Sequence, residues 1–249
     1  MTKLAIISDI HSNIDAFEAV LAHIDEKGAD MIINLGDIVG YGPAPVECMD
    51  LIHKREIQSV LGNHDEYVTL IMDPRVEKLR EDIRTVVEWT QSQLSMEDLK
   101  WLSKLPMRMD AEYFEILHAS YAPVRWSYCL DENTFAINFK FQEPMLAFCG
   151  HSHSPLIALD NGEESKPLVD YIRGESHKIK LPEDRKIMVN VGSVGQPRDR
   201  DPRACVVFYE LEQRELWLDR VPYDLEKAKE RFVKAELPER FGERILLGK

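Results

Sequence analysis

Short aliphatic runs alternate with amphipathic segments along the first sixty residues of the chain. The runs at residues 4–7, 31–35 and 58–61 have the length of buried strands. Between the first two, apolar residues recur at helical spacing from Ile14 to Ile24, and Gly28 marks a plausible helix end. Another helix is predicted from Pro43 or Pro45 to Lys54, because proline is tolerated in a first turn. The alternation of strand and helix predicts a parallel sheet.

The middle of the chain is more charged and predicts mainly helices. Residues 74–104 contain apolar groups at helical intervals, and Ser95 with Asp98 approximates a capping box, so two helices are expected there. This insertion, about 74–105, either overhangs a site or forms a solvated cover. Strands are predicted at 113–117 and 145–149, with a helix at 131–141 between them.

The C-terminal part predicts a second, mostly antiparallel sheet. Its strands are expected at 156–159, 187–191, 205–211 and 215–221, with Asn161-Gly162 as a hairpin-type turn. Asp224 is predicted to cap a final helix at about 224–236. The expected fold class is therefore α/β, with two facing mixed β-sheets flanked by helices in a four-layer α-β-β-α sandwich. We expect residues 1–249 to form one domain.

Polar fragments follow four of the predicted strands. Strand ends are where open α/β sheets place their sites, so these groups are expected to meet. They offer imidazole, carboxylate and amide ligands without a cysteine, which favours two divalent ions of manganese, iron, zinc, nickel or cobalt. The fragments are Asp9-Ile10-His11, Gly36-Asp37, Gly62-Asn63-His64-Asp65 and Gly150-His151-Ser152-His153.

The composition narrows the possible partners and location. A formal net charge of −13 disfavours binding to nucleic acid or to an anionic membrane, and a small phosphorylated substrate fits better. The first apolar run is too short for a signal peptide, and no run approaches membrane-spanning length. The four cysteines are far apart in the sequence, which is typical of reduced thiols in a cytoplasm. The sequence makes no prediction of oligomeric state.

The order of these fragments resembles the calcineurin-like metallophosphoesterase superfamily. The similarity runs from Lys3 to about Tyr209, and the phrases DIHSNIDAFEAVL, LGDIVGYGP and VNVGSVGQPRDRDPRA resemble its small prokaryotic phosphoesterase branch. Around His118, related sequences usually read His-Gly-Ser, whereas this chain has Ala119 in place of glycine. The replacement puts the conformation of that loop in question.

The resemblance implies a role for each matching residue. Asp37 would bridge two metals, and His64 would protonate the leaving oxygen while Asp65 orients it. Taken alone, Asn63 also fits a turn residue and His118 a buried core histidine. The implied ligands are Asp9, His11, Asp37 and His153 for one metal, and Asp37, Asn63, His118 and His151 for the other.

Candidate substrate contacts lie outside these fragments. Arg198 offers a planar fork for phosphate, and the backbone N–H groups of residues 192–195 could face an anion or simply belong to a loop. Asn13 is expected either to cap the first helix or to touch substrate.

The predicted activity is that of a binuclear metal-dependent phosphodiesterase acting on a small phosphorylated or nucleotide substrate. A hydroxide bridging the two metals would attack phosphorus. A dinucleoside polyphosphate pyrophosphohydrolase and a non-catalytic metal-binding regulatory scaffold are the alternatives. A nuclease is disfavoured by the acidic composition.

Overall fold

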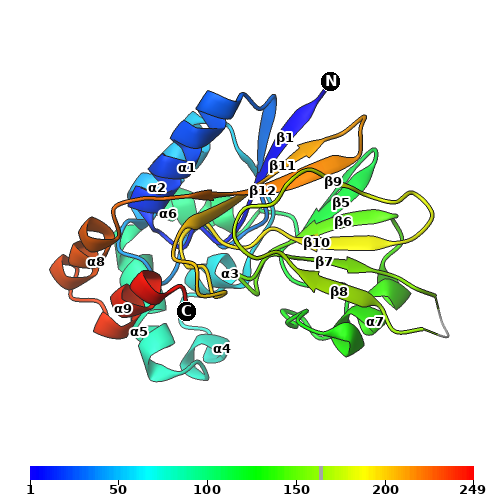
Figure 1. Ribbon diagram of the computed structural model, residues 1–249. Coiled ribbons are helices and arrows are strands. Elements are labelled where there is room, and N and C mark those ends of the chain that lie inside the picture. The colour runs from blue at the N-terminus through cyan, green and yellow to red at the C-terminus, as the bar shows by residue number, and fades with distance from the viewer. Residues whose placement is uncertain (163–164) are drawn as a thin grey trace.

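The computed structural model describes residues 1–162 and 165–249, and two six-stranded sheets form its centre (Figure 1). In the first sheet, three strands are parallel: β1 (Lys3–Ile7), β2 (Met31–Asn34) and β3 (Gln58–Ser59). The antiparallel strands β11 (Ala204–Glu210), β12 (Glu215–Val221) and β9 (Ile179–Lys180) continue from β1. This sheet is therefore mixed.

The second sheet is also mixed. Its order is β4 (Arg108–Ala111), β5 (Phe114–Leu117), β6 (Leu146–Cys149), β10 (Ile187–Asn190), β7 (Leu156–Leu159) and β8 (Leu168–Tyr171). Strands β5, β6 and β10 run parallel, and their neighbours run antiparallel.

Alternating side chains of the strands divide the core into layers. Along β1, Leu4 and Ile6 lie between the sheets together with Phe148 and Tyr209, whereas Ala5 and Ile7 face the helices outside. Two helices that pack against this outer face are α1 (Ile14–Lys27) and α2 (Pro45–Lys54). Helix α7 (Glu132–Phe141) covers the outer face of the second sheet. The expected four-layer sandwich is confirmed.

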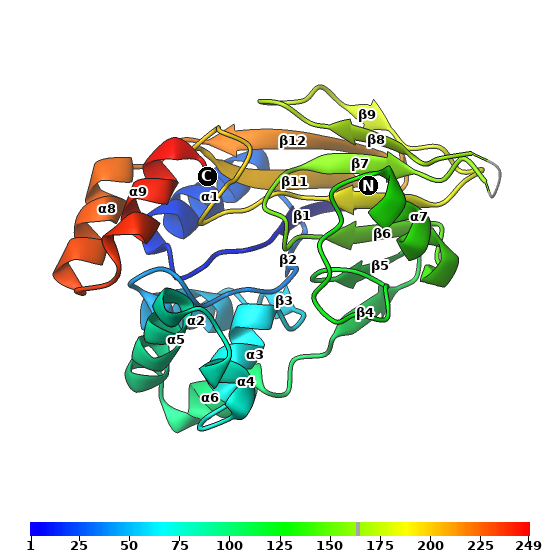
Figure 2. The same ribbon diagram turned by 90° about the horizontal axis from the view of Figure 1, so that it is seen from below.

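The remaining helices gather at one end of the molecule (Figure 2). They are α3 (Asn63–Thr69), α4 (Pro74–Glu77), α5 (Glu81–Gln93), α6 (Met96–Leu102), α8 (Leu225–Lys234) and α9 (Glu239–Leu247). Among the described helices, none combines the length and apolar content needed to cross a membrane.

The structure corrects the predicted assignment of strands to sheets. Strands β11 and β12 belong to the first sheet, because β11 pairs with β1 along residues 207–210. The predicted strands at 113–117 and 145–149, for which the sequence indicated no sheet, lie in the second sheet as β5 and β6. The apolar pattern indicates a strand but not its partner, which is decided by contacts between distant segments.

Several predicted boundaries also differ. Residues 74–104 hold three helices rather than two, because Asp73 caps a separate short helix that starts at Pro74. The final predicted helix is followed by α9, for which no helix was predicted. Strands β7 and β8 do pair as a hairpin, but residues 160–167 connect them and positions 163–164 are outside the described residues. Asn161-Gly162 is thus only the start of a longer connection.

Candidate metal centre

The structure brings all the predicted ligand residues to one place. Asp9 and His11 follow β1, Asp37 follows β2, Asn63 begins α3, His118 follows β5, and His151 and His153 follow β6. All of these side chains are buried. Two clusters of possible ligand atoms share Asp37: one comprises Asp9, His11, Asp37 and His153, and the other Asp37, His118 and His151. Asn63 adjoins the second cluster, with its Oδ1 3.2 Å from His118 Nε2.

The backbone around these residues is unusual. Asp9, His11, Asp37, His151 and His153 all have φ between 49° and 63°, in the left-handed region. Such conformations are uncommon for residues other than glycine and are concentrated at functional sites. They turn the chain sharply at each strand end, so that carboxylates and imidazoles point toward a common centre.

Two glycines permit the loops to approach one another. A Cβ atom at Gly62 would overlap the backbone nitrogen and carboxylate of Asp37, and one at Gly150 would overlap Ser8 Oγ and Asp9 Oδ2. These positions therefore require glycine for steric reasons, and the close packing of the loops depends on them.

Hydrogen bonds to backbone carbonyls determine which nitrogen of each imidazole is available. His11 Nδ1 lies 3.3 Å from the carbonyl oxygen of Val39. His118 Nδ1 lies 2.8 Å from the carbonyl oxygen of Leu35, and His153 Nδ1 lies 2.6 Å from that of Gln196. For His151, the Nε2 atom lies 3.0 Å from the carbonyl oxygen of Trp126. Because each of these nitrogens must donate, the opposite nitrogen of each ring is left as an acceptor, as in metal-binding histidines.

The acceptor atoms face one another, which fits bound cations. His11 Nε2 and His153 Nε2 are 3.1 Å apart, although both rings already use Nδ1 as the donor. Asp9 Oδ1 is buried and has no hydrogen-bond partner among the described residues. Asp37 Oδ2 lies 3.5 Å from His11 Nε2 and 3.3 Å from His118 Nε2, between the two clusters. Repulsion between buried lone pairs is relieved when positive charge lies among them, so this set fits divalent metals.

The carboxylates and imidazoles of the centre shift one another's pKa values. Burial opposes ionisation of Asp37, but the neighbouring His118, His64 and His11 hold its pKa well below its usual value. Burial would lower the pKa of His118, yet the Asp37 and Asp9 carboxylates raise it to about 9. These carboxylates therefore favour a positive charge at His118 Nε2, which either a proton or a metal cation bound to that nitrogen supplies.

His64 lies beside this cluster. Its backbone N–H donates to Asp37 Oδ1 at 2.8 Å, and its ring packs 4.3 Å from that of Tyr41. Among the residues that the structure describes, its buried Nδ1 has no partner. Burial lowers the pKa of His64 to about 4.

Asp65 does not orient His64, and that prediction was wrong. The Asp65 carboxylate accepts hydrogen bonds from the backbone N–H groups of Asp37 at 2.8 Å, Val39 at 3.1 Å and Gly62 at 3.1 Å. Burial and the Asp37 charge raise its pKa to about 7, despite these hydrogen bonds. Asp65 thus holds the loop that carries Asp37.

Asn13 caps the first helix. Its Oδ1 accepts from the N–H of Ala16 at 3.2 Å, and its Nδ2 donates to the Gly195 carbonyl at 2.9 Å and lies 3.3 Å from the Tyr223 hydroxyl. The side chain is buried and its polar atoms are already bonded. Of the two alternatives for Asn13, the geometry favours the cap over substrate contact.

Three of the four backbone N–H groups of residues 192–195 are used within the fold. The N–H of Gly192 donates to Asn190 Oδ1 at 3.0 Å, and those of Val194 and Gly195 donate to the carbonyls of Ser8 and Asp9, each at 2.9 Å. These N–H groups therefore do not face an anion, contrary to one of the two sequence-based alternatives. They fasten this loop to the end of β1.

Arg198 lies against Tyr41, close to the ligand cluster that contains His11. Its Nη2 donates to Gln196 Oε1 at 2.9 Å and lies 3.4 Å from the Tyr41 hydroxyl. The guanidinium carbon is 5.8 Å from the centre of the Tyr41 ring. Tyr41 itself contacts His11, with ring centres 4.6 Å apart. Arg198 therefore lies near the centre, and its predicted role as a substrate contact stays a prediction.

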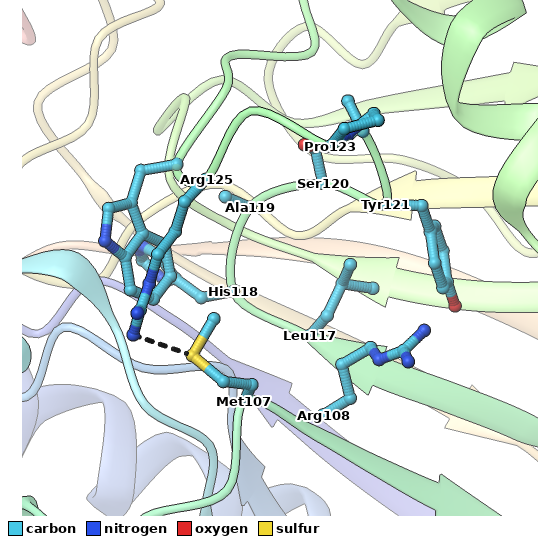
Figure 3. Close-up of a pocket in the computed structure, with 11 residues that line it drawn as sticks. Met107, Arg108, Leu117, His118, Ala119, Ser120, Tyr121, Pro123 and Arg125 are labelled. Carbon is cyan, nitrogen blue, oxygen red and sulfur yellow. Dashed lines mark hydrogen bonds between the residues drawn. The ribbon is translucent and has the colours of Figure 1, made fainter.

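A pocket of about 250 Å³ opens beside His118 (Figure 3). Arg125, Arg108, Met107 and Tyr121 line it, and Arg125 donates to the sulfur of Met107 at 3.2 Å. Ala119, which replaces the usual glycine, does not adopt a positive φ. The replacement thus leaves the loop unstrained at this position.

Three aromatic residues near the centre were not assigned by sequence reasoning. Trp126 has a φ of 60°, its carbonyl accepts from His151, and its Nε1 donates to Glu66 at 2.8 Å. Tyr128 stacks on His151 with ring centres 4.1 Å apart. Tyr41 lies in the phrase LGDIVGYGP, which was noted only for the family resemblance. Neither periodicity nor spacing distinguishes these aromatics from ordinary core residues.

Comparisons with known proteins agree with this geometry. Residues 2–214 match the calcineurin-like phosphoesterase superfamily domain. The chain is 37% identical to an uncharacterized protein of Methanocaldococcus jannaschii, over 100% of this chain and 99% of that one. A metallophosphoesterase structure from Sphaerobacter thermophilus is 33% identical and superposes with a TM-score of 0.87, covering 100% and 99% of the two chains.

A more distant relative is named for its activity. The symmetrical bis(5'-nucleosyl)-tetraphosphatase of Chromobacterium violaceum is 28% identical over 120 residues, which are 47% of this chain and 43% of that one. The extent of the family match, together with the Asp and His clusters at the strand ends, identifies the protein's family. The chain belongs to the calcineurin-like phosphoesterase superfamily, a family that uses two divalent metals, and is a metal-dependent phosphoester hydrolase.

Proposed function

We propose that the protein is a binuclear phosphodiesterase acting on a small phosphorylated or nucleotide substrate. The observation that carries this proposal is the convergence of four imidazole acceptor nitrogens on the Asp9 and Asp37 carboxylates. Asp9, His11, Asp37 and His153 would hold one metal, and Asp37, Asn63, His118 and His151 the other. When bound, the two metals supply Lewis-acid chemistry to the phosphoryl group.

His64 is the proposed general acid. Its ring lies against Tyr41 and His11, and its backbone is tied to Asp37, so it remains beside the ligands without being needed as one. In the free protein its pKa is depressed by burial. A phosphate group placed next to it would favour the imidazolium, because an adjacent negative charge raises a histidine pKa. His64 would then donate a proton to the leaving oxygen.

The pocket beside His118 is the proposed place for the rest of the substrate. It lies next to the second cluster, and Figure 3 shows Arg125 and Met107 near His118, with Tyr121 on another side. Aliphatic, aromatic and cationic groups together suit an organic group attached to phosphate. We place the enzyme in the cytoplasm as part of the same proposal, which the four buried free cysteines support.

A second candidate function is hydrolysis of a pyrophosphate bond in a dinucleoside polyphosphate. It is supported by the Chromobacterium violaceum relative and by Arg198, which would add a cation beyond the metal centre. Phosphodiester and pyrophosphate hydrolysis require the same metals and differ in the number of charges that the pocket must accept.

One assay series tests the proposed function. Metal-free protein is reloaded with Mn, Fe, Zn, Ni or Co singly and assayed with a phosphomonoester, bis(p-nitrophenyl) phosphate and a dinucleoside polyphosphate. We expect hydrolysis of the diester to exceed that of the monoester, and to require metal. Metal binding without hydrolysis of any of the three substrates would support the regulatory scaffold instead.

A further inference from the structure

The connection between β5 and α7 contacts two histidines of the second cluster. This connection, residues 118–131, contains no helix or strand. The ring of Tyr128 stacks on His151 with ring centres 4.1 Å apart, and the ring of Trp126 lies 5.6 Å from that of His118. The carbonyl of Trp126 accepts from His151 Nε2 at 3.0 Å, which leaves Nδ1 of that imidazole as the acceptor. The conformation of Trp126 therefore determines how His151 is presented to a metal.

The backbone conformation of Trp126 is one that few residues of its size adopt. Its φ of 60° lies in the left-handed region, which is maintained only where surrounding contacts stabilise it. Glu66 provides such a contact, because its Oε2 accepts from Trp126 Nε1 at 2.8 Å. Its other oxygen, Oε1, lies 3.0 Å from Arg125 Nη2, and the Arg125 guanidinium carbon lies 5.0 Å from the centre of the Trp126 ring. The carboxylate thus fixes two successive residues of the connection.

Glu66 belongs to α3, the helix that begins with the candidate ligand Asn63. Its N–H donates to the Gly62 carbonyl at 3.0 Å in the first turn, and residues three apart lie on the same face of a helix. The side chain is buried, which is rare for a carboxylate that is not paired. Both of its oxygens already face donors, so Glu66 is not needed as a ligand. It joins the helix that carries Asn63 to the connection that orients His151.

The histidines of the first cluster are oriented by other parts of the chain. His11 Nδ1 faces the carbonyl of Val39, and His153 Nδ1 faces that of Gln196. Neither carbonyl belongs to α3 or to the β5–α7 connection. Loss of the Glu66 carboxylate should therefore affect the two metals unequally.

We propose that Glu66 is a positioning residue for the second metal, the one assigned to Asp37, Asn63, His118 and His151. Its carboxylate fixes Trp126, so that the Trp126 carbonyl holds the His151 ring in the orientation required of a ligand. This inference rests on the proposed function, because it assumes the two-metal centre described there.

The test begins with Glu66→Met, which keeps the length of the side chain and removes both acceptor oxygens. We expect manganese affinity at the second site to fall about 10–100-fold and that at the first site to change less than about twofold, as for other residues that support one ligand. Calorimetric titration measures the affinities, and anomalous diffraction assigns them to the two sites. Glu66→Gln retains one acceptor oxygen and should restore part of the loss.

Arg75→Gln is the matched control. Arg75 Nη1 lies 3.4 Å from Glu66 Oε1, but its side chain is mostly exposed and also pairs with Asp73. Ion pairs in solvent contribute little, so this variant should bind both metals as the wild type does.

A measurement on metal-free protein tests the contact itself. The indole N–H signal of Trp126, identified by its absence in Trp126→Phe, should exchange slowly with solvent in the wild type and faster in Glu66→Met, because buried hydrogen-bonded N–H groups are protected. Trp126→Phe should also weaken the second metal. Combining it with Glu66→Met should add little, since both changes break the same connection. Trp126→Phe decides the question alone if Glu66→Met does not fold.

Three results would overturn the inference: equal weakening of both metals, an unchanged second site in both Glu66→Met and Trp126→Phe, or a wild-type protein that binds only one metal. A change in KM with both metals retained would also overturn it, because Glu66 would then act on the substrate pocket through Arg125. If the wild type binds two metals but hydrolyses no substrate, the proposed function fails, and the affinities of the two sites still decide the role of Glu66.

Discussion

The carboxylate of Asp65 is hydrogen-bonded to the backbone N–H of Asp37 at 2.8 Å. The same carboxylate also accepts from Gly62 and Val39, so one buried side chain joins the loop after β2 to the start of α3. This relationship makes Asp65 a positioning residue for the proposed bridging ligand rather than a partner of His64.

Replacing Asp65 with asparagine should therefore weaken metal binding. The amide retains one acceptor oxygen but sets an NH₂ group against a backbone N–H, so at least one hydrogen bond is lost and the Asp37 loop shifts. We expect metal affinity to fall about 10–100-fold, in the range found for residues that support metal ligands. Calorimetric titration with Mn²⁺ measures this effect. The exposed Glu97 provides a matched control as Glu97→Gln, and unchanged affinity in Asp65→Asn would contradict the positioning role.

Asp37→Asn should weaken both metals together. Its Oδ2 lies between His11 Nε2 and His118 Nε2, so loss of the charge affects both ligand clusters. His11→Ala should chiefly affect the cluster that contains Asp9 and His153. Elemental analysis and anomalous diffraction of protein loaded with excess manganese report the two sites separately. Loss of the same single ion in both variants would rule out the bridge.

His64→Ala should leave metal content nearly intact and reduce turnover. For substrates with a poor leaving group, we expect a loss on the order of 10²–10⁴-fold, because a general acid contributes that much. An activated nitrophenyl ester should be affected less, since nitrophenolate departs without a proton. Metal analysis and kcat with both kinds of ester are the measurements. An equal, small deficit with both esters would mean that His64 is not the general acid.

The buried thiols should make stability fall at alkaline pH. Burial raises the pKa of Cys129 to about 12 and that of Cys205 to about 11. The pKa of a thiol in an unfolded chain is about 8.5. Above that value the unfolded state releases protons that the folded state keeps, so unfolding becomes easier as pH rises. The contribution of each buried thiol to the free energy of unfolding is complete below about pH 8.5. Above that pH it decreases by up to about 1.4 kcal/mol per pH unit.

Urea unfolding at intervals from pH 7.5 to 10.5 measures this dependence. The free energy of unfolding should decrease over that interval, and Cys129→Ala should show a shallower decrease than the wild type. A decrease of identical steepness in both proteins would assign it to groups other than this thiol.

Local sequence determined the positions of the main strands and the chemistry at their ends. Aliphatic runs followed by Asp9, Asp37, Asn63 and His151 predict buried strands ending in metal ligands, because burial and side-chain chemistry are properties of short segments. The order of these fragments was specific enough to indicate the family, and the family match is confirmed.

The tertiary structure decided which segments meet. Strand β11 pairs with β1 across about two hundred residues, Asp65 bonds to Asp37 rather than to His64, and Asn13 is used as a cap. The available nitrogen of His153 depends on a carbonyl at Gln196, and Tyr41 beside the centre packs against Phe241 from the far C-terminal end of the chain. Hydrophobic periodicity carries no information about these partners, because each depends on hydrogen bonds and packing between loops that come together only after the sheets have formed.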